Sequence, residues 1–503
     1  MTAAKEDFKL NDLDESNAIT NDPALLALGH EPVEYSPEEG RSVLRKIDLH
    51  LLPMLMWVYM IQFADKTSLN YASVMGIRED THLDSNSDEY SWISSIFYAG
   101  YIAWEFPTTY LLRRLPLGKY TSSFIVAWGV ILACHAAANN YASLLALRFL
   151  LGVFESTITP AFVLFVSIWY KRGEQAKRVN AWLCCNGIGT LIMAPFAYGL
   201  SAATGAELAT WHILFLILGA LTVVTGAFLV YYMPDNQLSA RFLDVREKSI
   251  AVERIRENFQ GIGNRVWSWS QFREAFTDPR TYLYVLFSLL MNIPNGGYTT
   301  FGSIIIKSFG FDNRLALLLQ MPGGFVDIVC KLGFGALSDW MSDRTFPAIC
   351  AILIPMVGGI MMITIPLSAP GGLLVGYYLI SCAGASWGLV MVMISNNTVG
   401  YTKKVTVNGL QILAYGAGNW IGPQIFQSKD APDYFPGKLN MAIMYGAAAC
   451  TLLAIRIVNI IENKKRDKAQ GQENADTSAG APKGDGAFLD LTDGQQKDFR
   501  YIL

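Results

Sequence analysis

Residues 210–233 read TWHILFLILGALTVVTGAFLVYYM and contain no aspartate, glutamate, lysine or arginine. As an α-helix this run would be about 36 Å long, more than the roughly 30 Å hydrocarbon core of a bilayer. The apolar residues are continuous rather than alternating, which excludes a strand of a membrane barrel. Because a bilayer offers the backbone no hydrogen-bonding partners, we expect a membrane-spanning helix here.

Similar apolar runs recur along the 503-residue chain, and we expect twelve membrane-spanning helices in an all-α membrane protein. They lie at residues 48–70, 88–112, 119–138, 142–170, 177–202, 210–233, 281–309, 316–339, 345–366, 371–400, 404–428 and 436–461. The composition agrees, because only 16% of the residues are charged against about 25% in soluble proteins. A soluble enzyme is excluded, and the acidic, polar N-terminus does not resemble a cleavable signal peptide.

The charged residues divide the twelve spans into two halves of six. More than half of the charges fall outside the spans, and we expect five regions: an N-terminal tail (1–47), a six-helix bundle (48–233), a linker (234–280), a second six-helix bundle (281–461) and a C-terminal tail (462–503). The polar tails are expected to be disordered. Charges at helical spacing in 245–258 predict an amphipathic helix, either solvated on the membrane surface or serving as a regulatory docking site.

Basic residues mark alternate connections between the spans and so predict the orientation. Under the positive-inside rule, these connections, both termini and the linker lie in the cytoplasm. The basic residues are Arg113, Arg114, Lys119, Lys171, Arg172, Lys177, Arg178, Arg344, Lys403 and Lys404.

Four ionisable residues lie inside the first and fourth spans, where charge is costly unless it is paired or faces a cavity. Asp65 and Lys66 are neighbours in the first span, and Arg148 and Glu155 share one helical face of the fourth. A carboxylate in a low-dielectric cavity holds a proton more readily unless a cation offsets the cost. We therefore expect Glu155, and secondarily Asp65, to couple transport to protons, and Arg148 and Lys66 to bind substrate. A static Asp65–Arg148 ion pair is the structural alternative.

Polar residues in three later spans are further candidates for substrate binding. In the seventh span Pro294, Gly296 and Gly297 are expected to interrupt the helix, which exposes polar groups to a cavity or merely makes a gating kink. In the other two spans, hydrogen bonding between helices is an equal alternative. The candidates are Asn292, Asn295, Tyr298, Asn397, Gln411 and Asn419.

Two halves of six helices suggest a site at the membrane midplane that opens alternately to either side. The sequence contains no phosphate-binding loop of the kind that ATP hydrolysis needs, so uphill transport must use an ion gradient. We expect no cofactor and no metal. The net charge of −3 gives no reason to expect a nucleic-acid partner.

Several motifs resemble a known family. The loop that contains Gly335, Asp339, Asp343 and Arg344 is similar to the gating loop of the major facilitator superfamily, and Leu111–Lys119 is a degenerate copy of it. Other stretches resemble the anion:cation symporter family within it, specifically its fungal allantoate permease-like branch. They are Phe63–Leu69, Arg148–Thr157, Asn295–Gly297, Gly400–Lys404, Gly422–Pro432 and the tail that contains Phe488 and Phe499–Leu503.

The resemblance implies a multi-pass plasma-membrane symporter that imports protons with a small organic anion, such as allantoate, ureidosuccinate, nicotinate, pantothenate, biotin or cysteine. It maps coupling and substrate-binding roles onto Asp65, Lys66, Arg148 and Glu155. The first-half loop lacks the acidic residue usual at its centre, which leaves its gating contacts in doubt.

Two alternatives stay open beside the symporter: a nutrient sensor that signals through its cytoplasmic segments, and proton-coupled efflux. An enzyme is not expected, since no nucleophile–base or metal constellation is present. We expect a monomer in the lipid bilayer.

Overall fold

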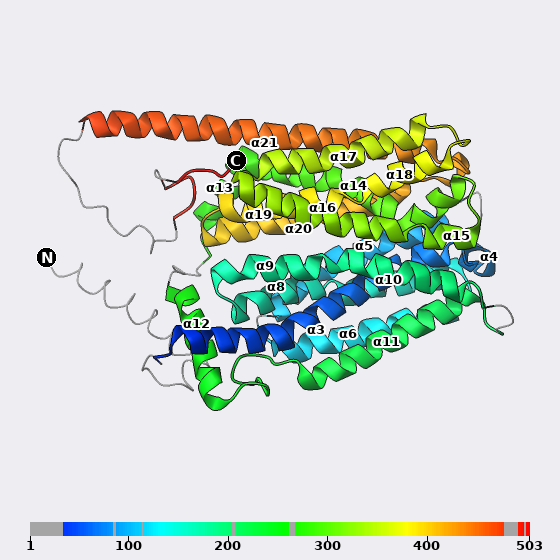
Figure 1. The fold of residues 1–503 in the computed structure, drawn as a ribbon, viewed down its shortest axis with the longest axis horizontal. Coiled ribbons are helices and arrows are strands. Elements are labelled where there is room, and N and C mark those ends of the chain that lie inside the picture. Colours follow the sequence, from blue (N-terminus) through cyan, green and yellow to red (C-terminus); the bar gives the residue numbers. More distant parts are fainter. Residues whose placement is uncertain are drawn as a thin grey trace.

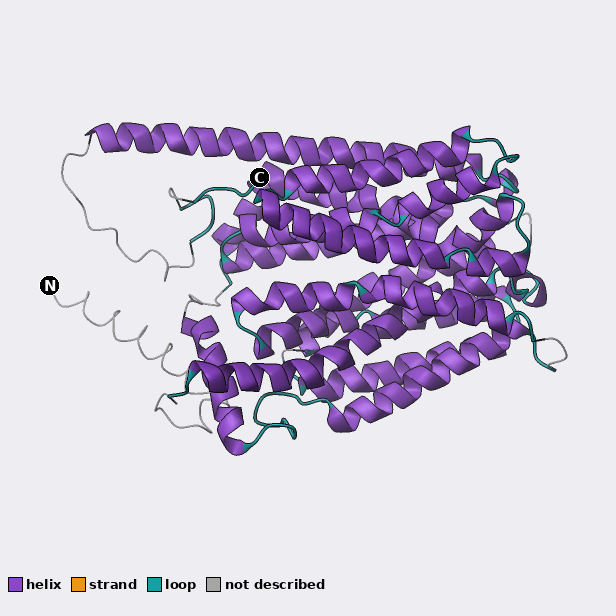
Figure 2. Cartoon of the chain, in the orientation of Figure 1, coloured by secondary structure: helices purple, strands orange, loops and turns teal. Residues whose placement is uncertain are grey.

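The computed structural model describes residues 34–83, 87–112, 114–203, 207–260, 267–476, 491–496 and 499–503, and these fold into helices joined by loops, with no strand among them (Figure 2). The Phe488 of the tail motif and the basic Arg113 lie outside the described residues.

The helices form two bundles that lie side by side (Figure 1). The first, which we call the N-bundle, is built by six spans, of which the fourth and fifth each consist of two helices. Its helices are α3 (Pro37–Ala72), α5 (Glu89–Leu111), α6 (Leu117–Cys134), α7 (Tyr141–Glu155) with α8 (Ile158–Trp169), α9 (Arg172–Leu183) with α10 (Cys185–Leu200), and α11 (Thr210–Tyr232).

The second bundle, the C-bundle, also contains six spans, with breaks in its second and fourth. Its helices are α14 (Pro279–Ser308), α15 (Asn313–Leu318) with α16 (Met321–Met341), α17 (Thr345–Thr364), α18 (Pro370–Ile380) with α19 (Ala383–Asn397), α20 (Tyr401–Gln424) and α21 (Phe435–Asp476). The twelve-helix fold expected from the sequence is confirmed.

Three of the twelve spans differ from the rest in polarity. Nine helical segments in the described part of the chain are long and apolar enough to cross a membrane. The other three, α5, α14 and α20, are long but less apolar, and α5 packs against α20 where the bundles meet. Their polarity is explained by their position, because they face protein rather than lipid.

The two ends of the bundles are distinct. We call one end of the bundles the tail side (Figure 1). Helix α3 begins there, and α21 extends beyond the bundle there. The same end holds the linker helices α12 (Val245–Gln260) and α13 (Trp269–Thr277). At the other end, the loop side, lie α4 (Ile77–Asp80) and α15. The linker is shared between the bundles, because α12 contacts α3 and α13 contacts α20.

The segments outside the predicted spans are more ordered than the sequence suggested. Ser36 caps α3, so helix already begins at Pro37 inside the expected N-terminal tail. The 42-residue α21 continues to Asp476, a length of about 63 Å. The expectation of disorder is wrong for this part of the C-terminal tail, where charged residues continue the helix beyond the apolar run.

The bundles are joined to each other on the loop side by hydrogen bonds, most of them between neutral groups; in one, the Ser428 amide donates to the Asp88 carboxylate at 3.1 Å. Asn70 of α3 donates to Gln320 at 2.8 Å and accepts from the Ser303 amide at 2.7 Å. Ser94 of α5 shares a 2.6 Å hydrogen bond with Thr300 of α14. Further bonds join Tyr90 to the Thr300 carbonyl, Ser91 to the Phe426 carbonyl and Ser95 to the Trp420 carbonyl. These bonds close the loop side.

A glycine contact joins the bundles at a second place. A Cβ atom on Gly187 of α10 would lie 2.6 Å from the Gly324 carbonyl oxygen of α16, and one on Gly324 would lie 2.6 Å from the Gly187 oxygen. Only glycine permits this approach, so the two bundles meet there backbone to backbone.

Candidate substrate pocket

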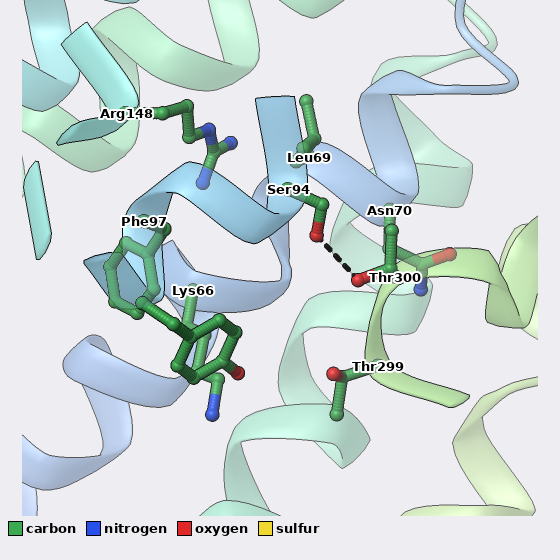
Figure 3. A pocket seen from close by; sticks show the side chains of 9 residues that line it. Lys66, Leu69, Asn70, Ser94, Phe97, Arg148, Thr299 and Thr300 are labelled. Carbon is green, nitrogen blue, oxygen red and sulfur yellow. Dashed lines mark hydrogen bonds between the residues drawn. The ribbon is translucent and has the colours of Figure 1, made fainter. Parts of the chain in front are cut away.

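A pocket lies between the bundles, directly inside the closed loop side (Figure 3). The space in it that protein atoms do not fill, including space open to solvent, is about 310 Å³. Both bundles contribute to its wall. The lining residues are Lys66, Leu69, Asn70, Ser94, Phe97, Tyr98, Arg148, Thr299 and Thr300.

Arg148 of α7 lines this pocket, and one edge of its guanidinium is buried and unpaired among the described residues. The residue is 2% exposed, and neither its Nε nor its Nη2 has a hydrogen-bond partner. The same edge of Arg178 holds the Asp48 carboxylate at 3.0 and 2.6 Å. That of Arg280 holds Asp278 at 2.8 and 2.7 Å. Because this edge fits a carboxylate in two parallel bonds, Arg148 can bind the carboxylate of another molecule.

Lys66 of α3 supplies the second cation of the pocket. Its Nζ donates to the Tyr415 hydroxyl at 3.2 Å and lies 5.2 Å from the ring centroid of Tyr98 and 5.7 Å from that of Tyr415. Tyr98 belongs to the N-bundle and Tyr415 to the C-bundle, so Lys66 contacts both. Cation–π contacts of this kind stabilise the charge without an acidic partner.

Two acids are buried near these cations. Asp65 accepts a hydrogen bond from Thr222 Oγ1 at 2.9 Å, and Glu155 accepts one from Gln62 Nε2 at 2.8 Å. The other carboxylate oxygens, Asp65 Oδ1 and Glu155 Oε2, are buried without a hydrogen-bond partner. Among the described residues, no base lies within 4.0 Å of either carboxylate. The static Asp65–Arg148 ion pair is therefore not formed in this state.

Glu155 lies at the break in the fourth span. It is the last residue of α7, and the span is broken at Ser156 and Thr157 before α8 begins. Its partner Gln62 lies one turn of α3 before Lys66, toward the tail side. Asp65 and Glu155 thus lie at different depths of one polar region.

The seventh span is not interrupted as the sequence suggested. α14 is a continuous helix from Pro279 to Ser308 with Pro294 inside it. Its glycines serve close packing instead, because a Cβ on Gly296 would lie 2.7 Å from the Asn419 carbonyl oxygen of α20. The interruption was wrongly predicted because glycines, which weaken a helix, also allow the backbone of a neighbouring helix to approach closely.

The polar residues predicted in α14 and α20 mostly contact each other. Asn419 donates to Asn292 at 3.1 Å and accepts from Asn295 at 2.8 Å. Tyr298 shares a 2.8 Å hydrogen bond with Ser381, which lies at the break between α18 and α19. None of these residues is among those that line the pocket.

Gln411 and Asn397 have different environments. Gln411 is 1% exposed, and both polar atoms of its side chain lack a hydrogen-bond partner. Asn397 lies at the tail-side end of α19 and makes two hydrogen bonds to the main chain of Ile502. The structure thus places Asn397 apart from the pocket.

The predicted gating loop is held by a network of hydrogen bonds on the tail side. Arg344 donates to Asp339 at 2.6 Å, and Arg456 of α21 donates to Asp343 at 2.6 Å. Gly335 precedes them in α16, where a Cβ would meet nothing within 4 Å. The two acids and Arg344 therefore connect α16 and α17 with α21.

Several lining residues were missed from the sequence: Asn70, Ser94, Phe97, Tyr98, Thr299 and Thr300. One signal was available, because Ser91, Ser94 and Ser95 recur at the spacing of one helical face. The threonines directly follow Tyr298, and hydroxyls that bond to their own helix are common in membrane spans, so they carried no separate signal.

Comparison with known proteins agrees with this architecture. Residues 55–423 match the Major Facilitator Superfamily. Among curated relatives, an uncharacterized transporter of Schizosaccharomyces pombe is 39% identical over 93% of this chain and 91% of its own. The allantoate permease of Saccharomyces cerevisiae is 37% identical over 95% and 89%. The thiamine pathway transporter THI73 of the same yeast is 36% identical over 98% and 92%.

Solved structures share the fold. A bacterial homologue of the human lysosomal transporter Spinster, in an inward-facing and unoccupied conformation, has a TM-score of 0.62 at 16% identity over 84% of this chain and 98% of its own. The xylose transporter XylE of E. coli, in a partially occluded inward-open conformation, also has a TM-score of 0.62, at 14% identity over 82% and 98%. The chain is a membrane transporter that belongs to the major facilitator superfamily, in its fungal allantoate permease-like branch.

Proposed function

We propose that this transporter imports a small organic anion together with protons, by alternating access across the plasma membrane. One observation carries the proposal: Arg148 lines a pocket between the bundles and has an unpaired guanidinium edge, and near it lie two buried acids, Asp65 and Glu155, without an ion-pair partner among the described residues. Leaving buried charges unpaired is costly, so a protein that keeps them has a use for them during transport.

The anion would be held by both cations of the pocket. Arg148 offers the bidentate edge that other arginines of this chain use for carboxylates, and Lys66 offers a second charge from α3. Thr299 and Thr300 of the C-bundle reach the same pocket (Figure 3). Substrate contacts would therefore link the two bundles. The yeast relative's name makes allantoate, itself a carboxylate, the first compound to test.

The proposal places the tail side in the cytoplasm. Lys171, Arg178, Arg344 and Lys403, which lie in or beside short connections, are at this side, as expected of cytoplasmic connections. The loop side then faces outward, and the closed loop side corresponds to the state that releases substrate inward. Both termini are cytoplasmic in this orientation.

Glu155 is the proposed proton carrier. Its neighbour Gln62 can donate to the charged carboxylate or accept from the protonated one by turning its amide. Because Glu155 has no ion pair to break, it can take up a proton from outside and release it inside while losing few contacts. Asp65, bonded to Thr222, is the second candidate.

The test uses purified protein in liposomes with radiolabelled allantoate or nicotinate. If one proton enters with each singly charged anion, every unit of external acidification supports about tenfold accumulation. A protonophore should abolish that accumulation and leave substrate exchange intact. Uptake that ignores the pH gradient would refute coupling, and proton-driven movement in the opposite direction would establish efflux instead.

Recognition of the carboxylate is tested separately with matched compounds. Nicotinate and nicotinamide differ mainly in that charge, so the anion should compete for uptake at least about tenfold better. Equal competition would remove Arg148 from substrate recognition. Binding without any flux in either direction would favour a sensor.

A further inference from the structure

The C-terminal segment, residues 491–496 and 499–503, lies against the tail side of the C-bundle (Figure 1). Asp493 is 0% exposed and Tyr501 is 3% exposed. Full burial of a carboxylate in a polar tail is unusual. The surface that receives the segment therefore buries an acid and an aromatic ring, as a ligand site does.

This surface provides a basic environment for Asp493. The carboxylate is 3.0 Å from Arg280 Nη2 and 2.9 Å from Lys403 Nζ, and it accepts a hydrogen bond from the Tyr501 hydroxyl at 2.8 Å. Arg280 begins α14 and Lys403 begins α20. One side chain of the tail thus connects the first turns of the two helices that pack most closely in the C-bundle.

The ring of Tyr501 packs against the guanidinium groups of two arginines. It lies 3.7 Å from the Arg280 guanidinium and 4.7 Å from that of Arg466. Arg466 of α21 also donates to the main-chain oxygens of Asp493, Gln496 and Phe499. One arginine therefore recognises the ring and the path of the backbone together.

Two asparagines recognise the main chain of the segment. Asn397 accepts from the Ile502 amide and donates to the Ile502 carbonyl, both at 2.8 Å. Asn463 accepts from the Tyr501 amide at 2.9 Å and donates to the Tyr501 carbonyl at 2.8 Å. Each asparagine side chain thus satisfies both the main-chain donor and the main-chain acceptor of one residue of the segment.

We propose that the tail side of the C-bundle is a peptide-binding site for a segment with a buried acid followed by an aromatic residue, and that its own C-terminal segment occupies it in cis. The site itself is built by side chains of α14, α19, α20 and α21, all of which precede the segment in the chain. Occupancy fixes the tail-side ends of α14 and α20, whose opposite ends reach the pocket and the closed loop side. The site is thus a control point, and its existence does not depend on which substrate is carried.

The test is peptide binding in trans. A chain that ends at residue 490 is purified, and a fluorescent synthetic peptide of residues 491–503 is titrated against it by anisotropy. We expect saturable binding, at least about tenfold weaker for the Asp493→Asn peptide because a charge-assisted contact is lost. An Ile502→Ala peptide is the matched control: the Ile502 side chain is 38% exposed and the site holds this residue by its main chain, so its affinity should change by about threefold or less.

The full-length protein supplies a second test should the shortened chain not fold. Its own segment occupies the site, so it should bind the labelled peptide at least tenfold more weakly than full-length Asp493→Asn does. Hydrogen exchange of the Tyr501 and Ile502 amides should be slow in the unmodified chain and fast in that variant. Equal binding of a scrambled peptide, or slow exchange that persists in Asp493→Asn, would overturn the proposal.

Discussion

The two groups of buried charges in this protein are built in opposite ways. In the pocket group, Asp65, Lys66, Arg148 and Glu155, no acid has a base within 4.0 Å among the described residues. In the tail-side group, Asp278, Arg280, Lys403 and Asp493, each charge lies within 3.0 Å of at least one opposite charge.

The difference separates charges that the proposed transport would use from charges that stabilise the fold of the tail side. Charges that are fully paired stabilise one arrangement, because removing one partner leaves the other buried alone. Asp278 pairs with both Arg280 and Lys403, so these two bases keep a partner when Asp493 leaves with the C-terminal segment. Unpaired charges destabilise the resting state and remain available for a proton or an ion. Substitutions should therefore affect transport in the first group and folding stability in the second.

The largest effect is expected for Glu155→Gln. The amide keeps the size of the side chain and its contact with Gln62 but cannot carry a proton, so accumulation driven by a pH gradient should be lost while exchange of substrate across the membrane continues. Parallel accumulation and exchange assays in liposomes measure this. Glu105→Gln is the matched control, since Glu105 is a buried acid of α5 that lacks the contact with Gln62 made by Glu155. Accumulation that survives in Glu155→Gln would remove this residue from coupling.

Arg148→Lys should come next. Lysine keeps the charge but lacks the two-bond edge, so the half-saturating concentration for a carboxylate should rise about 10- to 100-fold, and the preference for nicotinate over nicotinamide should shrink. Arg178→Lys makes the same change at an edge already occupied by Asp48, and it should leave that preference intact. Equal loss of preference in both variants would mean that Arg148 does not bind substrate.

A substitution in the tail-side group should act on stability instead. Asp278→Asn removes one acid from a buried network and should lower the free energy of unfolding by about 3 kcal/mol, with transport per folded molecule changed little. Thermal unfolding in detergent measures the first quantity, and uptake normalised to folded protein measures the second.

The same residue predicts a dependence on pH. Burial opposes ionisation of Asp278, but Arg280 and Lys403 outweigh it and hold its pKa below the ordinary value. A lowered pKa in the folded state contributes stability that is complete above the unfolded value, about 3.9, and is lost as the pH falls through the folded value. The stability difference between wild type and Asp278→Asn should therefore narrow below about pH 4. A constant difference would contradict this.

The smallest effect is expected at the edge of the tail-side group. Asp467 pairs with Arg500, but its side chain is 63% exposed, so Asp467→Asn should change the free energy of unfolding by at most about 1 kcal/mol. A larger loss would contradict the expectation that an exposed ion pair stabilises the fold less than a buried one.

The sequence predicted the twelve helices well because all are long and nine of the described spans are strongly apolar, and the positions of Arg148 and Lys66 in the pocket followed from the cost of intramembrane charge. It could not predict which polar residues face the pocket. Asn292, Asn295 and Asn419 bond to one another while Ser94, Thr299 and Thr300 line the wall, and this choice depends on helix rotation. The docking of Asp493 was hidden as well, since its partners come from helices far away in the sequence.

The hydrogen bonds that close the loop side have a consequence for the energy and timing of the cycle. Asn70, Ser94 and their partners are neutral, and such bonds contribute about 1 kcal/mol each, so a barrier made of a few of them is of the same order as the energy one proton gains across a few pH units. Neutral bonds also keep their strength when the outside becomes acidic or salty. The bond from the Ser428 amide to the Asp88 carboxylate involves a charged group and does not share this property. The neutral bonds therefore set the part of the gate that is insensitive to the salt and acid outside.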